Sequence, residues 1–102
     1  MRTLGTFRGS WAMACMDIDA LAQYENAAKQ GRADALYNLG LAYSTGQGVG
    51  VDYVAAHKWF NLAALRGSEE AKSWRAQISH EMVPSQIAEA QRLAREWLSI
   101  FS

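Results

Sequence analysis

A chain of 102 residues is long enough for one small domain, and half of its residues are hydrophobic, as in ordinary globular proteins. Ten basic residues balance ten acidic ones without forming a cluster, which argues against the basic face that nucleic-acid binding requires. The single cysteine, Cys15, excludes an internal disulfide and a cysteine pair for zinc, and no uncharged run is apolar enough to span a membrane.

Residues 1–16 follow no helical period, and we expect them to form an irregular N-terminal extension. Arg2 and Arg8 precede a short apolar run at residues 11–15, an order that resembles a secretory or lipoprotein leader. The run is shorter than the roughly 7–15 residues of a leader's hydrophobic region. We therefore expect a cytoplasmic protein, and a periplasmic or lipid-anchored protein is the alternative.

The first predicted helix lies within residues 17–31. Asp17 or Asp19 can cap its N-terminus, and Gly31 can adopt the left-handed conformation that ends a helix. Its apolar residues recur every three or four positions, at Ile18, Leu21, Tyr24 and Ala28.

A second helix is predicted over residues 33–45, with Gly46 as its end. Its buried stripe is predicted to contain Leu36, Leu39, Gly40 and Tyr43. Because glycine inside a helix costs about 1 kcal/mol relative to alanine, we expect Gly40 to have a packing reason. The loop at residues 46–51 holds three glycines, which suit a tight turn.

Asp52 is a good N-cap for a third helix over residues 53–66. Apolar residues cover more than one side of this helix, at Ala55, Ala56, Trp59, Phe60, Leu62 and Ala63. A helix of this kind fits a stack of helices, in which it contacts its own partner and the next unit.

Ser68 is expected to cap a fourth helix, and Pro84 to begin a fifth. The fourth helix has the apolar stripe Ala71, Trp74, Ile78 and Met82. The fifth has the apolar line Ile87, Ala90, Ala94, Trp97, Leu98 and Phe101. Its opposite face carries charged residues, as the terminal helix of a stack requires.

An internal repeat links these elements. The segment around Gly31 is similar to the segment around Gly67, at an offset of 67 − 31 = 36 residues, and such a period indicates stacked helical hairpins. The pattern over residues 35–67 resembles the Sel1-like repeat, a relative of the tetratricopeptide repeat. The residues that carry it are Ala35, Leu39, Gly40, Tyr43, Gly46, Gly48, Val49, Asp52, Ala55, Trp59, Ala63, Ala64 and Gly67.

The resemblance implies an all-α fold, a short α-solenoid of antiparallel helical hairpins with about five helices. Residues 17–102 would then form one domain, with half a repeat at 17–31, a complete repeat at 33–67 and a degenerate capping hairpin at 68–102. Arg75 departs from the pattern, since it stands 36 residues after Leu39.

No group of residues predicts catalysis, a metal site or a cofactor. The glycine-rich loop follows a helix, whereas a phosphate-binding loop follows a strand. His57 and His80 lie on different helices without companion ligands, so we expect each at the surface or hydrogen-bonded between helices.

The resemblance implies a non-enzymatic adaptor for a protein or peptide partner. In tetratricopeptide-like stacks the first helix of each hairpin lines the concave side, and here it would present Tyr37, Asn38, Leu41, Ser44 and Thr45. A structural role for Asn38 at a neighbouring helix end is equally open. The alternative function is self-assembly, as a homodimer joined through apolar terminal helices.

Overall fold

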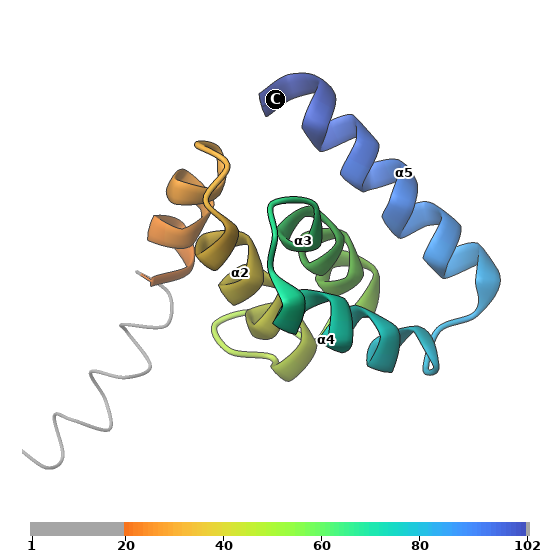
Figure 1. Cartoon of the computed structure of the whole chain (residues 1–102). Coiled ribbons are helices and arrows are strands. Elements are labelled where there is room, and N and C mark those ends of the chain that lie inside the picture. Colours follow the sequence, from red (N-terminus) through yellow and green to blue (C-terminus); the bar gives the residue numbers. More distant parts are fainter. Residues whose placement is uncertain (1–19, 102) are drawn as a thin grey trace, which may run out of the picture.

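The computed structural model describes residues 20–101, and within this range the chain folds into helices only. Residues 20–28 form a helix, here called helix 20–28, and four more follow (Figure 1). These are α2 (Ala33–Thr45), α3 (Tyr53–Leu65), α4 (Glu69–Ser79) and α5 (Pro84–Phe101). The predicted all-α fold is therefore confirmed. The expected extension at residues 1–16 and the proposed caps Asp17 and Asp19 lie outside the described residues.

Local signals in the sequence set the helix boundaries. The Asp52 carboxylate accepts a hydrogen bond from the Ala55 backbone N–H at 3.1 Å and caps α3, as predicted. The Ser68 hydroxyl accepts one from the Ala71 N–H at 3.2 Å and caps α4 in the same way. Gly46 ends α2 with a φ of 79°, a left-handed conformation that glycine adopts without strain.

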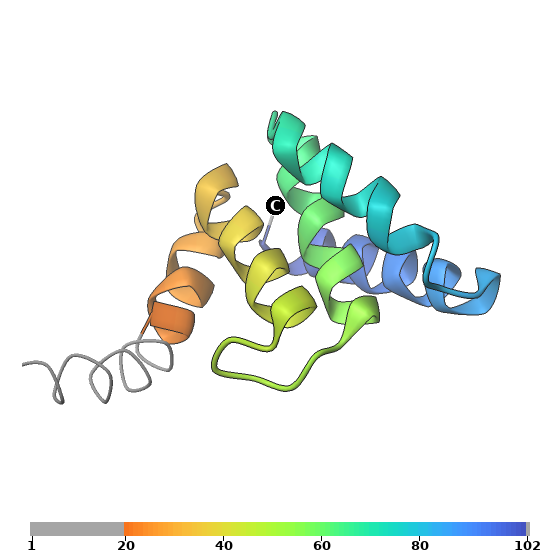
Figure 2. The ribbon, with the colours of Figure 1, turned by 90° about the horizontal axis from the view of Figure 1, so that it is seen from below.

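Helix α3 lies at the centre of the fold and contacts α2, α4 and α5 (Figure 2). Its residues Ala56, Phe60 and Ala63 are fully buried, and Trp59 and Leu62 are nearly so. This confirms the prediction that apolar residues on several sides of the helix would each meet a neighbour. Burial of this many apolar side chains in one helix makes α3 the main source of hydrophobic stabilisation.

Gly40 marks the closest approach between α2 and α3. A Cβ atom at position 40 would lie only 2.5 Å from the Phe60 ring, so a larger residue cannot fit without displacing that ring. Phe60 in turn packs against Tyr37 of α2 and stacks on Trp74 of α4, with ring centroids 5.9 Å and 6.3 Å apart. The packing reason expected for Gly40 is therefore the Phe60 ring.

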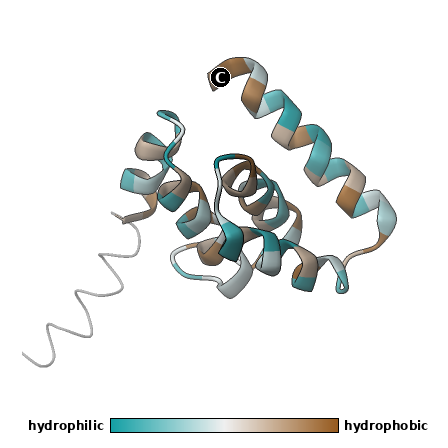
Figure 3. Cartoon of the chain, viewed as in Figure 1, coloured by the Kyte–Doolittle hydropathy of each residue, from teal (hydrophilic) through white to brown (hydrophobic). Residues whose placement is uncertain are grey.

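Helices α4 and α5 follow one another but do not form a regular hairpin. Each takes its main contacts from α3, and the two have at most slight contact with each other. Trp97 of α5 packs edge-on against Trp59 of α3 at 5.8 Å. Figure 3 shows hydrophobic and hydrophilic residues alternating along α5, and on its exposed face Arg92 bridges Glu89 and Glu96.

Candidate functional site

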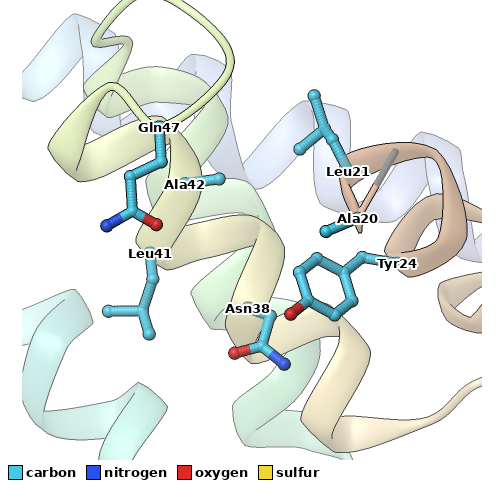
Figure 4. Close-up of a pocket in the computed structure, with 7 residues that line it drawn as sticks. All are labelled: Ala20, Leu21, Tyr24, Asn38, Leu41, Ala42 and Gln47. Carbon is cyan, nitrogen blue, oxygen red and sulfur yellow. The ribbon is translucent and has the colours of Figure 1, made fainter. Parts of the chain in front are cut away.

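A hollow of about 90 Å³ opens between helix 20–28 and α2 (Figure 4). We call it the 20–28/α2 hollow. Its lining carries no charge and consists of Ala20, Leu21, Tyr24, Asn38, Leu41, Ala42 and Gln47. Two of these, Asn38 and Leu41, belong to the predicted partner-binding residues. The hollow thus combines apolar walls with two amide groups and a phenol.

Two of the three polar side chains of the hollow, Tyr24 and Asn38, lie at one side of it, and Gln47 lies at the other end of the α2 wall. In Figure 4 the Tyr24 ring extends from helix 20–28 toward Asn38 on α2, which brings the phenol oxygen close to the side-chain amide. Tyr24, Asn38 and Leu41 are all half-buried. A phenol and an amide can each donate and accept hydrogen bonds, so this side of the hollow can recognise a polar group beside an apolar one.

Ser44 and Thr45 do not line the hollow, and their hydroxyl groups are already hydrogen-bonded within α2. Both hydroxyls donate to the backbone carbonyl of Leu41, at 3.1 Å and 2.7 Å respectively. Such back-bonding satisfies the hydroxyls within their own helix. A partner would have to compete with these bonds to use either side chain as a donor.

Tyr37 lies apart from Asn38 and Leu41. It lines a second, more open hollow of about 290 Å³, where the N-terminal ends of α2 and α4 meet beside Arg66. The structure therefore brings together two of the five predicted residues and places Tyr37 at another surface. The sequence did not identify Ala20, Leu21 and Tyr24 as residues of the site. A signal was present in the repeat, because each of them stands 36 residues before a buried residue of α3.

The prediction for His57 was wrong. Its side chain is only 3% exposed, and its Nδ1 atom has no hydrogen-bond partner. Burial lowers the pKa of His57, and the positive charge of Arg75 lowers it further, so the imidazole is neutral near pH 7. The Arg75 guanidinium donates instead to the Asn61 side chain at 2.6 Å. His80 is exposed, in agreement with the prediction.

Neither a metal site nor a membrane span is found in the part of the chain that the structure describes. Residues 20–101 contain no group of three histidine, cysteine or acidic side chains placed to hold a metal ion. Within the same residues no helix is both long and apolar enough to cross a bilayer.

Comparison with known proteins identifies the repeat. Residues 33–68, from the start of α2 to the cap of α4, match the family model of the Sel1 repeat. A search of curated proteins found no match. The matched segment coincides with the α2–α3 hairpin and the Gly40–Phe60 contact.

Proposed function

We propose that this chain, which contains a Sel1 repeat at residues 33–68, is a non-enzymatic adaptor that binds a protein or peptide partner through the exposed side of α2. Sel1 repeats are non-catalytic and generally mediate protein–protein interaction. The proposal assigns the contact to Asn38 and Leu41, with Ser44 and Thr45 beside them on α2 and Tyr37 as a separate contact at the second hollow.

The observation that carries the proposal is the uneven burial of α2. The side that faces α3 is fully covered, with Leu36 and Leu39 buried. The side that faces helix 20–28 leaves the 20–28/α2 hollow open. A partner that binds here would bury the rest of the Leu41 side chain and can hydrogen-bond to the Asn38 amide.

Capture of partners from an extract of the native cell tests the proposal. We expect the double variant Asn38→Ala with Leu41→Ala, which truncates the two predicted residues that line the 20–28/α2 hollow, to keep its helical circular dichroism and to lose the captured protein. A matched control is Gln77→Ala with Gln91→Ala, which truncates exposed side chains on α4 and α5. Loss of folding in the double variant would show that these side chains serve the core, and equal capture by both variants would refute the assignment to α2.

Self-assembly is the second candidate, and the end of α5 favours it. Ile100 is 67% exposed on the terminal helix, and Leu65 at the end of α3 is 62% exposed. A two-fold contact between copies would cover such residues. Sedimentation of the full chain over a range of concentrations tests this: a dimer that dissociates in Ile100→Glu but not in Ser99→Glu supports it, and a monomer at every concentration rejects it.

A further inference from the structure

Helix 20–28 and α3 carry an alanine, an aromatic residue and an alanine at equivalent positions. Ala20, Tyr24 and Ala27 precede Ala56, Phe60 and Ala63 by 36 residues, as in 60 − 24 = 36. Positions separated by three and four residues share one face of a helix. Each helix therefore presents an alanine, an aromatic ring and an alanine in a row.

The two rows differ in what covers them. Helix α2 covers the row on α3, and all three of its residues are fully buried. The row on helix 20–28 is only half-buried, and Ala20 and Tyr24 line the 20–28/α2 hollow. The 36-residue relation thus pairs a fully covered surface with one that is only partly covered.

The wall of the hollow that α2 forms has its equivalent in α4, at the same offset of 36 residues. Asn38, Leu41 and Ala42 correspond to Trp74, Gln77 and Ile78 of α4. Phe60 stacks on Trp74 on one side and contacts Tyr37 of α2 on the other, so that α2 contacts both α3 and α4. A helix in the equivalent place would contact helix 20–28 and α2 together and would close the hollow.

We propose that the 20–28/α2 hollow is the docking site for an amphipathic helix of a partner protein, which lies on helix 20–28 as α2 lies on α3. The inference rests on the proposed function only because Asn38 and Leu41 take part in both the proposed adaptor contact and the docking site. It replaces an unspecified partner with one helix of defined chemistry.

The features of that helix follow from the contacts of α2. A small residue must face Tyr24, because a Cβ atom at the equivalent position 40 would collide with the Phe60 ring. A leucine precedes this small residue, as Leu39 precedes Gly40 and is fully buried. The docking face is neutral, since no charged residue lines the hollow, and a polar side chain meets Tyr24 and Asn38.

A peptide that copies α2 is the probe. We would synthesise residues 33–45 with a side-chain bridge that holds the helix, label the peptide, and measure its binding to the full chain by fluorescence anisotropy. We expect saturable binding that weakens about tenfold or more when the peptide carries Gly40→Leu, because overpacking at a helix contact is strongly unfavourable.

Two protein variants locate the site. Ala20→Leu fills the hollow and should weaken peptide binding about tenfold, while Ala22→Leu makes the same chemical change at an exposed position of the same helix and should leave it unchanged. Absence of saturable binding, or equal binding by the two variants, would overturn the proposal. If the peptide fails to bind while the native partner is still captured, the helix is refuted and the adaptor stands.

Two other occupants give different results, and each would overturn the proposal. If a second copy fills the hollow, the full chain is a dimer that Ala20→Leu dissociates and Ala22→Leu does not. If residues 1–19 of the same chain fill it, the peptide does not bind and Ala20→Leu lowers the melting temperature while Ala22→Leu leaves it unchanged.

Discussion

Helices α2 and α4 occupy equivalent places in the repeat but differ in how many apolar faces they have. The face that α2 turns to α3 is apolar and consists of Leu36, Leu39, Gly40 and Tyr43. The residues 36 positions later in α4 are Lys72, Arg75, Ala76 and Ser79. Helix α4 therefore has no apolar face to offer to the helix that follows it.

This difference explains where α5 lies. Helix α4 buries Ala71 and Ile78 against the rest of the fold and stacks Trp74 on Phe60 of α3. With no second apolar face on α4, α5 packs on α3 through Trp97 and has at most slight contact with α4. A repeat hairpin thus depends on a specific set of facing side chains, because two adjacent helices alone do not suffice.

The largest expected effect comes from the Trp97→Ala variant, which removes the anchor of α5. Trp97 is 8% exposed and contacts Trp59 and Phe101, so its loss should cost about 3–5 kcal/mol. Because α4 and α5 are attached to α3 separately, we expect amide hydrogen exchange to accelerate in α5 and to stay slow in α4. Equal acceleration in both helices would show that they are held as a pair.

A smaller effect is expected from pH at the α3–α4 contact. The pKa of His57 is lowered in the fold from the ordinary value of 6.5, so the unfolded chain binds a proton more readily than the folded one. Stability should therefore fall as the pH drops below about 6.5 and level off below the folded-state pKa, at a rate of at most about 1.4 kcal/mol per pH unit for one group.

Variants assign this pH dependence to one residue. His57→Leu places at position 57 the residue type found at the equivalent position 21, and it should remove most of the slope in urea unfolding measured between pH 5 and pH 7. His80→Leu changes an exposed histidine and should keep the slope. A slope that survives in the His57 variant would contradict the assignment.

The smallest effects concern the helix caps. Asp52→Ala and Ser68→Ala each remove one side-chain hydrogen bond at a helix N-terminus and should cost about 1 kcal/mol. Loss of the α3 cap should lower the melting temperature of the whole chain, because three helices contact α3. Loss of the α4 cap should mainly speed hydrogen exchange in α4, and the reverse pattern would contradict a fold centred on α3.

Helix boundaries could be predicted from the sequence because their signals are local. The caps Asp52 and Ser68, the left-handed Gly46 and the proline that begins α5 each act within a few residues. The burial of Leu39 and Gly40 also followed from spacing within one helix. These features need no knowledge of how the helices pack.

The arrangement of the site could not be predicted in the same way. Tyr37 lines a different hollow from Asn38 and Leu41 because helix 20–28 and α4 meet α2 at different places. The spacing of residues within α2 does not predict these places. The burial of His57 without a partner for Nδ1, and the bond from Arg75 of α4 to Asn61 of α3, both depend on how these two helices pack. Spacing within one helix does not predict such contacts.

The most direct test of the difference between α2 and α4 is thermal unfolding of Gly40→Leu and Ala76→Leu in the full chain. These positions are equivalent in the repeat, but Gly40 is buried against Phe60 and Ala76 is exposed. We predict that Gly40→Leu loses at least about 1–3 kcal/mol, while Ala76→Leu stays within about 0.5 kcal/mol of the parent. Equal losses at both positions, or a raised melting temperature for Gly40→Leu, would contradict the account.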